Sequence, residues 1–489
     1  MENREDLKSI LPFLPLILRS SSLFWPSPVV SALKSLSKGP NHSNVNSGEI
    51  LFLAISDLRN SLRLSSHSLS PSSDEGYSIY FDELMSCVES RKWFEEIVPA
   101  LAMLLLRLPC LLEDHYLYAD ELRRGEKSGF YGVNTGLRVL ESQEAGIVFM
   151  SQELISALLA CSLFCLFPTN KRGGKRLSPI NFDSLFANLY PSYSQKQENK
   201  IMCLVHYFER ICLCMPKGYV SFERKVLPRK DNSQSVSYPK SDSWSKSMHQ
   251  LCSFEVCHSG LIEDQLCEAL EVDFANKYIG GGALSRGCVQ EEIRFMINPE
   301  LIIGMLFLPC MSDNEAIEIV GAERFSNYTG YASTFRFSGD FLDEKPTDCL
   351  KRRKTRIVAI DALSSPKMRQ YGVEYLLREI NKAFCGFLHK TEDKIGVVTG
   401  NWGCGAFGGD PEIKAVIQWL AASQASRPFI LYYTFKEEAL WDLEQVSSWI
   451  LSHEWTVGDL WNMLLEYSSQ RISYETRAGF LTWLIPGFT

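Results

Sequence analysis

The feature that most constrains the fold is a change in hydrophobic pattern across the polar stretch 228–247, which is rich in Ser and Lys. Before this stretch, apolar residues recur with helical spacing, as in 152–167 and 201–215. After it, short apolar or β-branched runs alternate with helical segments. The alternation predicts an α/β sandwich around a central sheet, preceded by a mostly helical region.

The pattern also predicts individual elements and three parts of the chain. The expected strands are 270–274, 301–307, 316–320, 356–360, 395–399 and 429–434, and the expected helices are 290–298, 371–388, 411–422 and 436–451. We therefore divide the chain into a helical accessory region (1–227), a polar loop or boundary (228–247) and an α/β domain with C-terminal helices (248–489).

Composition narrows the class of protein. Hydrophobic residues make up 45% and charged residues 22%, which is typical of a folded globular chain. A net charge of −8 argues against direct binding of nucleic acid through a broad basic face. We therefore expect any polyanionic ligand to be held locally, by backbone amides and a few cations.

The cysteines and the most apolar segment exclude other classes. The 15 cysteines show no zinc-like spacing, so we expect reduced thiols and no metal site. The N-terminus is polar and acidic, unlike a secretory signal. The run 97–112 is interrupted by Pro99, Arg107 and Pro109, so we expect a soluble protein without a membrane span.

A triple glycine, Gly280-Gly281-Gly282, lies between a predicted strand carrying Asp273 and a predicted helix that begins Gln290-Glu291-Glu292. Glycines expose backbone N–H groups, which allows them to approach an anion closely. A flexible turn is the simpler explanation of the glycines. Acidic residues in a first helical turn also complement the helix dipole, which is an equally simple explanation of the glutamates.

A second glycine-rich loop, 403–409, follows the predicted strand 395–399. Asp410 and Pro411 suit the N-cap and first position of the next helix, and glycine-rich backbone beside a helix N-terminus can bind an anion. No Gly-Lys-Ser/Thr follows, which excludes a Walker-type loop, and the spacing differs from a dinucleotide fingerprint. Asn401, just before the loop, could line a site or stabilise a turn.

Together these motifs resemble the poly(ADP-ribose) glycohydrolase family, whose signature is a triple glycine followed closely by Gln-Glu-Glu. The similarity continues through 328–331, 357–363 and 399–410 and covers most of 90–435. It implies a macrodomain, an ADP-ribose-binding α/β/α sandwich with a mixed central sheet, after a helical accessory domain. It also implies hydrolysis of ribose–ribose O-glycosidic bonds in poly(ADP-ribose), with release of ADP-ribose and no cofactor.

The resemblance implies roles for the acidic residues. Glu292 would protonate the departing 2′-oxygen and then activate water, while Glu291 would hydrogen-bond ribose hydroxyls. Asn276 and Gln290 would hold the substrate. Asp273 could orient Glu292 or disfavour its ionised form through like-charge repulsion. There is a physical conflict, because a helix N-terminus favours a carboxylate whereas a general acid must carry a proton.

The resemblance also assigns the ligand-facing residues. The second loop would hold the diphosphate, Phe407 would pack on the distal ribose and Tyr331 would stack on adenine. Phe435 is a weaker candidate on the adenine side, and a buried Tyr without such context is more commonly a core residue. The glycines assigned to substrate binding are Gly280, Gly281, Gly282, Gly403, Gly405 and Gly408.

Three alternatives stay open at the level of sequence. The chain could be a macrodomain reader that binds ADP-ribose without turnover, a hydrolase that removes single ADP-ribose units from side chains, or an unrelated dinucleotide enzyme. The basic run 351–356 is either a solvated loop or a nuclear import signal. We expect a monomer that acts on polymer-modified proteins in nucleus and cytoplasm, as in the DNA damage response.

Overall fold

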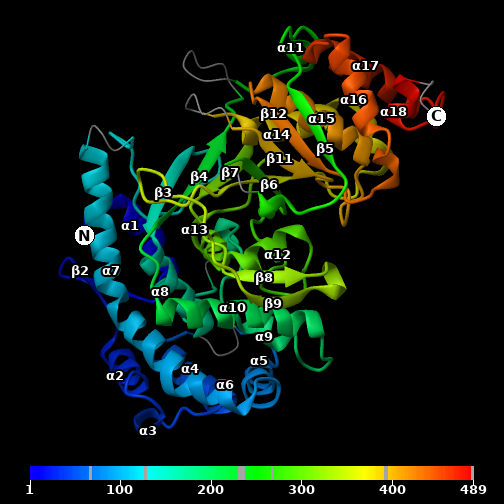
Figure 1. Cartoon of the computed structure of the whole chain (residues 1–489). Helices are drawn as coiled ribbons and strands as arrows, with labels where there is room; N and C mark the ends of the chain where they lie inside the picture. The colour runs from blue at the N-terminus through cyan, green and yellow to red at the C-terminus, as the bar shows by residue number, and fades with distance from the viewer. Residues whose placement is uncertain are drawn as a thin grey trace.

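The computed structural model describes residues 1–64, 69–125, 129–170, 172–229, 237–265, 268–389 and 395–485. Within these residues an eight-stranded sheet forms the centre, in the order β3-β4-β7-β10-β6-β11-β12-β5 (Figure 1). Its strands are β3 (Gly146–Ser151), β4 (Tyr219–Val226), β5 (Ser253–Cys257), β6 (Leu270–Ala275), β7 (Glu315–Val320), β10 (Arg356–Asp361), β11 (Val397–Gly400) and β12 (Phe429–Tyr433).

The sheet is mixed, as predicted. The strands β10, β6, β11, β12 and β5 pair in parallel, whereas β3, β4 and β7 pair antiparallel with their neighbours. Strand β10 shows why helices cover both faces. Val358 and Ile360 belong to one apolar core, and the alternating residues Ile357 and Ala359 belong to the other.

Helices complete the α/β/α sandwich on the two faces. One core contains α14 (Val373–Phe387), α15 (Pro411–Gln424), α16 (Leu443–Ser452) and α17 (Val457–Ile472). The other contains α8 (Gln152–Leu163), α10 (Gln195–Leu213), α12 (Gln290–Ile297) and α13 (Gly304–Phe307). The predicted fold class is therefore confirmed at the level of layers and sheet.

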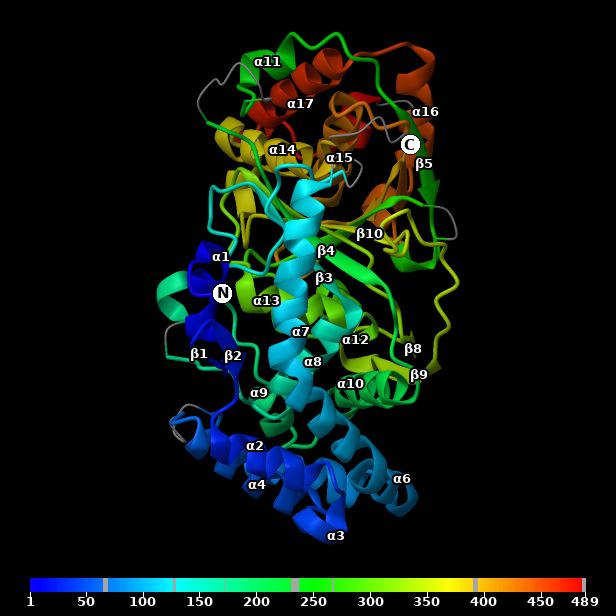
Figure 2. The ribbon, with the colours of Figure 1, turned by 90° about the vertical axis from the view of Figure 1, so that its left-hand side faces the viewer.

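The N-terminal half is mostly helical and extends away from the sheet. The 27-residue helix α7 (Val98–Arg124) runs alongside, and α2 (Ser27–Leu36), α4 (Gly48–Ser61) and α6 (Cys87–Lys92) gather at the far end of the molecule (Figure 2). Shorter elements are α1 (Glu5–Ile10), β1 (Ile17–Arg19), β2 (Ser22–Phe24), α3 (Pro40–Ser43), α5 (Ser73–Ser78), α9 (Asp183–Ala187), α11 (Ser241–Ser245) and α18 (Phe480–Leu484). In the described part of the chain, none of the helices has the length and apolarity that a membrane crossing needs.

Two predicted elements were wrong. Segment 301–307 is not a strand but a 3₁₀ turn (Pro299–Ile303) followed by α13, because a fully buried apolar run has no periodicity that separates the two. The helix expected over 436–451 starts only at Leu443, after a 3₁₀ turn at Glu438–Leu440. Lys436 has a φ of +61°, which no α-helix accommodates.

The sheet also crosses the boundary expected from sequence. Strands β3 and β4 belong to the predicted helical region 1–227, yet β4 pairs with β7 along six residues of each strand. Residues 230–236 of the predicted loop 228–247 lie outside the described residues. The division into parts therefore stays a prediction.

The topology places the two glycine-rich loops side by side. The first loop follows β6 and the second follows β11, and these strands are parallel neighbours, so both loops leave the same edge of the sheet. A two-stranded hairpin, β8 (Ser326–Thr329) and β9 (Arg336–Asp340), lies below them near α10 (Figure 1).

Candidate active site

Glu291, in the first turn of α12, ties the helix to the loop that follows β6. Its Oε2 accepts the backbone N–H of Asn276 at 2.8 Å, and its Oε1 accepts that of Gly280 at 2.6 Å. The side chain is buried. Both oxygens therefore serve to hold the loop, which leaves only their remaining lone pairs for a ligand.

Glu292, the next residue of α12, binds the same loop. Its Oε1 accepts the backbone N–H of Gly282 at 2.9 Å, and its Oε2 accepts that of Val289 at 2.8 Å. The bond from Val289 is the returning half of a capping box, since Glu292 occupies the third position of the helix. Glu292 is only 7% exposed, so a group that reaches it must enter a nearly closed site.

The glycines are explained by these carboxylates. A Cβ at Gly281, where φ is +49°, would lie 2.7 Å from an oxygen of each glutamate, and a Cβ at Gly287 would lie 2.7 Å from Cδ of Glu292. Both distances are shorter than van der Waals contact. The acidic groups next to the triple glycine are thus the protein's own carboxyl side chains, and the role of these glycines in substrate binding stays a prediction.

Two side chains expected to hold substrate are partly used within the protein. Gln290 accepts the N–H of Phe274 at 2.8 Å and donates to the carbonyl of Val272 at 3.1 Å, which fixes the start of α12 on β6. Asn276 accepts the N–H of Tyr278 through Oδ1 at 3.0 Å, an Asx turn. Its Nδ2 has no partner among the described residues and is available to a ligand.

Asp273 on β6 is buried, and neither carboxyl oxygen has a hydrogen-bond partner in the described part of the chain. Burial raises the pKa of Asp273 to about 8; the nearby Arg294 opposes the rise and the charge of Glu292 adds to it. No hydrogen bond joins Asp273 to Glu292, so Glu292 acts on Asp273 through charge alone.

Burial also raises the pKa of Glu291 well above its usual value, and the charges of Asp273 and Glu292 act in the same direction. Burial therefore favours the protonated forms of Asp273 and Glu291, which lie beside Glu292. For Glu291, this effect opposes that of the helix N-terminus.

A pocket of about 460 Å³ adjoins the carboxyl cluster. The predicted site residues that line it are Gln290, Tyr331, Asn401, Gly403, Gly405, Phe407 and Phe435. The predicted site residues that do not line it are Gly408, Asn276, the triple glycine 280–282 and the carboxyl cluster, which consists of Asp273, Glu291 and Glu292. Since Gln290 immediately precedes the two glutamates, the pocket ends where the carboxyl cluster begins.

The second glycine-rich loop keeps its amides unbonded. The backbone N–H groups of Gly405, Ala406 and Phe407 have no acceptor within the described residues, and all three residues line the pocket. Asp410 caps α15 as predicted, accepting the amides of Glu412 at 3.0 Å and of Ile413 at 3.3 Å. Consecutive unbonded amides beside a helix start are a suitable site for a phosphate group.

A buried lysine supports this loop from behind. Lys414 pairs with Glu379, and its ammonium lies 4.0 Å from the centre of the Trp402 ring. A Cβ at Gly403 would approach Cβ of Ala362 to 2.5 Å, which explains the glycine there. No local pattern in the sequence marks Lys414.

The two aromatic candidates both face the pocket. Tyr331 is 54% exposed at the turn between β8 and β9, so it is not a core residue. Phe435 is 43% exposed and has a φ of +50°, a backbone strain that a non-glycine residue rarely carries without a reason. Its ring lies 6.0 Å from that of Tyr433.

Two other polar side chains have structural partners. Asn401 donates to the carbonyl of Thr434 at 2.9 Å and accepts the hydroxyl of Tyr432 at 3.1 Å, so it joins the ends of β11 and β12 as well as lining the pocket. Asp361 pairs with Arg378 at 2.6 Å and with Lys382 at 2.7 Å.

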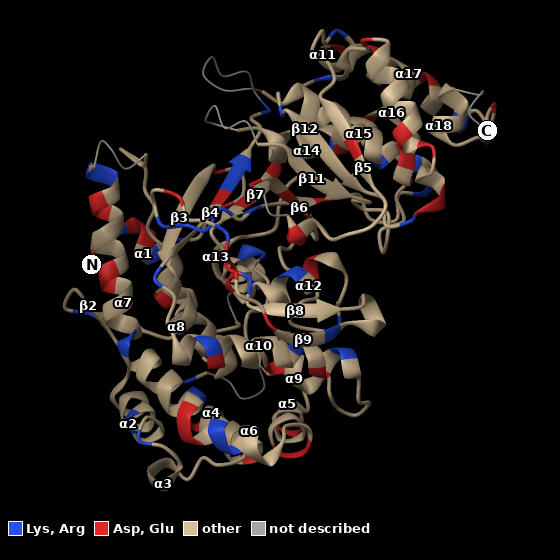
Figure 3. Cartoon of the chain, in the orientation of Figure 1, with Lys and Arg blue, Asp and Glu red and all other residues tan. Residues whose placement is uncertain are grey.

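Charges elsewhere are largely paired. In the basic run, Arg352 pairs with Asp348 at 2.8 Å and Lys354 pairs with Glu268 at 3.1 Å. Figure 3 shows Lys and Arg interspersed with Asp and Glu over both halves of the molecule. Among the described residues, no group of His, Cys, Asp and Glu is arranged to hold a metal ion.

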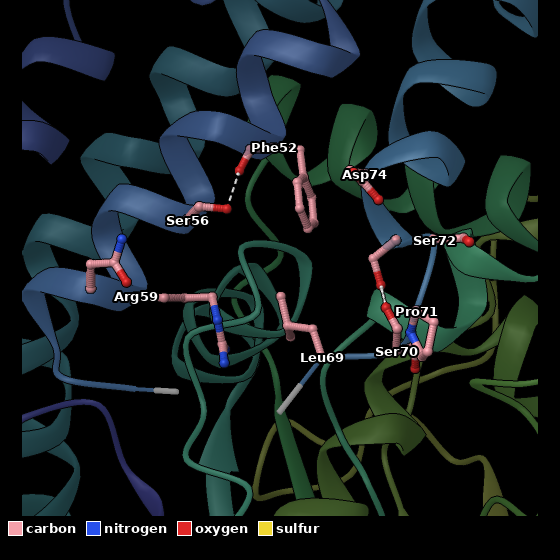
Figure 4. Close-up of a pocket in the computed structure, with 10 residues that line it drawn as sticks. Phe52, Ser56, Arg59, Leu69, Ser70, Pro71, Ser72 and Asp74 are labelled. Atoms are coloured by element: carbon pink, nitrogen blue, oxygen red, sulfur yellow. Dashed lines mark hydrogen bonds between the residues drawn. The ribbon is translucent and has the colours of Figure 1, made fainter. Parts of the chain in front are cut away.

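A second hollow, of about 370 Å³, lies in the N-terminal helices between α4 and the start of α5 (Figure 4). Ser56 donates to the carbonyl of Phe52 at 3.0 Å and Ser73 to that of Ser70 at 2.6 Å. These hydroxyls serve the local backbone, so we assign no ligand to this hollow.

Sequence reasoning missed the contribution of helix α10. Lys200 is completely buried, and its ammonium donates to carbonyls of the first glycine loop. Lys200 is some eighty residues from that loop in sequence, and no local pattern marks it. Only the fold brings the two together.

Comparison with known families matches both halves of the chain. The family model described as poly(ADP-ribose) glycohydrolase, macro domain fold, matches residues 241–442. The model of the helical domain of the same family matches residues 85–224. The predicted macrodomain and preceding helical domain are thereby confirmed.

Two plant relatives match nearly the whole chain, and a nematode relative matches about half of it. Poly(ADP-ribose) glycohydrolase 1 of Arabidopsis thaliana is 57% identical over 99% of this chain and 98% of its own length. Probable poly(ADP-ribose) glycohydrolase 2 of the same plant is 52% identical over 99% of both chains. Poly(ADP-ribose) glycohydrolase 1 of Caenorhabditis elegans is 35% identical over 54% of this chain and 35% of its own length.

Proposed function

Because the chain belongs to the poly(ADP-ribose) glycohydrolase family, we propose that it cleaves ribose–ribose O-glycosidic bonds in poly(ADP-ribose) chains on modified proteins. The products are ADP-ribose and a shortened chain. The observation that carries the proposal is Gln290-Glu291-Glu292, locked to a glycine loop at the end of a pocket of suitable size.

The terminal ADP-ribose unit occupies the pocket in a defined direction. Its diphosphate accepts the amides of Gly405, Ala406 and Phe407, which have no other partner in the described residues. Adenine stacks on the exposed ring of Tyr331, with Phe435 as the other aromatic wall. The distal ribose lies on Phe407 and reaches toward Glu292.

Glu292 acts as acid and then as base. Its carboxyl proton passes to the departing 2′-oxygen as the glycosidic bond breaks, and an oxocarbenium-like sugar forms. The resulting carboxylate then takes a proton from water as that water attacks the anomeric carbon. Amides of Gly282 and Val289 hold both oxygens of Glu292 in place throughout.

Replacement of Glu292 tests this assignment. Glu292→Gln keeps the shape but cannot exchange a proton, so turnover on purified poly(ADP-ribose) should fall by ~10²–10⁴-fold. ADP-ribose affinity should change little, since the second glycine loop and Tyr331 are untouched. A Gln side chain has only one oxygen for the two backbone N–H groups that bind Glu292. The melting temperature of the variant must therefore be measured alongside its activity.

Glu291→Gln is the matched variant, because Glu291 also accepts two loop amides. It should lose activity with a larger share of the loss in substrate affinity. Near-normal hydrolysis by Glu292→Gln would contradict the assignment. A wild-type protein that binds ADP-ribose but leaves the polymer intact would instead support a reader.

For cellular location and assembly, we propose a monomer in nucleus and cytoplasm that does not bind nucleic acid directly. The ion pairs of Arg352 and Lys354 favour a structural role for the basic run over an import signal. Lys351 is exposed and is therefore the residue of the run to replace. If the run has a structural role, a fluorescent fusion with Lys351 replaced by Gln should keep its nuclear signal. Loss of that signal would restore the import hypothesis.

A further inference from the structure

Helix α10 belongs to the helical half of the chain but contacts the catalytic loop directly. The Lys200 ammonium donates to the carbonyls of Ser285 at 2.7 Å and Gly287 at 2.6 Å, and lies 3.4 Å from that of Gly282. Three carbonyls therefore surround a group with three donors. Lys200 has no exposed surface, so this arrangement is not a surface contact.

The carbonyls around Lys200 belong to the residues that hold the proposed acid. The N–H of Gly282 binds Oε1 of Glu292 at 2.9 Å, and the backbone of Gly287 lies directly against that carboxyl. A further bond of 3.1 Å joins the N–H of Gly287 to the carbonyl of Gly282. A single residue of backbone thus connects the two side chains, since its carbonyl faces Lys200 and its N–H binds Glu292.

The residue before Lys200 contacts the β8–β9 hairpin. Oδ1 of Asn199 accepts the backbone N–H of Phe337, on strand β9, at 2.9 Å. Neighbouring turns of α10 support the same hairpin, since Gln195 accepts from Arg336 at 2.5 Å and His206 lies 2.9 Å from Asp340. This hairpin carries Tyr331.

Adjacent residues of a helix point about 100° apart, so one turn of α10 contacts both the catalytic loop and the hairpin. We propose that α10 sets the distance between the two ends of the substrate pocket, with Lys200 positioning the acid/base end and Asn199 positioning the adenine end. The inference rests on the assignment of Glu292 made above.

The cost of burying Lys200 supports a specific role. Burial lowers the pKa of Lys200 to about 8, and the groups facing it are Cys288 and Glu292 across the loop and Lys196 and Cys203 on its own helix. An apolar residue would fill a packing site without this cost. The ammonium is retained for its bonds to the loop carbonyls.

The test separates the two ends. Lys200→Met should lower kcat on poly(ADP-ribose) by on the order of 10²-fold, because the loop shifts relative to substrate. Its Kd for ADP-ribose should stay within about threefold of wild type, within the usual effect of a change away from the ligand. Asn199→Ala should do the opposite, raising the ADP-ribose Kd by up to about tenfold with little change in kcat.

Lys196→Met is the matched control. It lies one turn earlier on the same helix and donates a single bond, of 3.0 Å, to Arg286 in the same loop. Because it is partly exposed and touches only one carbonyl, kcat should stay within about threefold of wild type. A similar loss in Lys196→Met and Lys200→Met would overturn the proposal.

A double-mutant cycle distinguishes positioning from general stability. If Lys200 acts through Glu292, Lys200→Met should cost little further activity in a Glu292→Gln background. Additive losses, or equal falls in ADP-ribose affinity and kcat, would overturn the inference. Should Lys200→Met not fold, Lys200→Gln retains two N–H donors and should recover part of kcat. Wild-type protein without hydrolysis would refute the function itself, independently of α10.

Discussion

The two glycine-rich loops leave the same edge of the sheet and have similar compositions, yet they use their backbone amides in opposite ways. In the loop after β6, the amides of Gly280 and Gly282 bind carboxylates of the protein. In the loop after β11, the amides of Gly405 and its two successors have no partner in the described chain.

The difference shows that a glycine run does not by itself identify a phosphate site. The amides of the first loop bind acidic side chains of the protein itself, whereas we propose that those of the second loop bind an external anion. The space around the glycines differs in the same way. A Cβ at Gly281 would clash with both glutamates, whereas one at Gly405 would meet nothing within 4 Å.

The comparison predicts its largest effect at Gly281. Gly281→Ala should displace both carboxylates and lower turnover by on the order of 10²-fold or more. ADP-ribose affinity should change little, since the second loop is intact. Hydrolysis assays and calorimetry measure the two quantities, and unchanged turnover would show that the carboxylates tolerate displacement.

The next effect concerns Tyr331, the side chain that we propose stacks on adenine. Tyr331→Ala should weaken ADP-ribose binding by roughly 1–3 kcal/mol, the usual range for base–aromatic stacking. Tyr331→Phe retains the ring and serves as its control. Titration calorimetry gives both dissociation constants, and equal values for all three proteins would remove Tyr331 from the site.

A smaller effect is expected in the pH dependence of stability, through Asp273 on the strand that precedes the first loop. The carboxyl of Asp273 has a pKa near 3.8 when unfolded and about 8 when folded. As pH rises between these values the unfolded chain loses this proton first, so wild-type stability falls. Asp273→Asn does not lose stability in this way. At pH 8 its melting temperature should therefore be a few degrees above that of wild type.

The gain should shrink toward pH 4, where Asp273 is protonated in both states. Melting curves across this range give the difference directly. A constant difference, or none, would mean that Asp273 is not the buried neutral carboxyl described above.

The smallest effect is expected at Gly405. Its φ is not in the left-handed region and a Cβ has open space, so Gly405→Ala should change stability by less than about 0.5 kcal/mol. ADP-ribose affinity should change by less than about threefold, because the amide itself is retained. A large loss would indicate that the ligand packs directly on this Cα.

Local signals explain what the sequence could predict. Strands β6, β7, β10, β11 and β12 follow from short buried runs, and α12 and α15 follow from their acidic or capped first turns. The glutamates and both glycine loops were found because each motif lies within a few residues. Segment 301–307 failed because full burial removes periodicity.

The other failures share a different cause. Strand β4 is a long-range partner of β7 and β3 pairs with β4, while Lys200, Asn199 and Lys414 acquire their roles only through contacts distant in sequence. Nothing around Lys200 distinguishes it from a solvated lysine at the start of an amphipathic helix. Such residues require the fold.

The membership of β3 and β4 in the central sheet has a consequence for synthesis of the chain. The sheet's edge leaves the ribosome before its middle, and β7 begins only after a further 88 residues beyond the end of β4. At roughly 5–20 residues per second, this delay lasts on the order of ten seconds. During that time the unpaired edge of β4 must be covered by nascent helices or by chaperones, since an open strand edge invites aggregation.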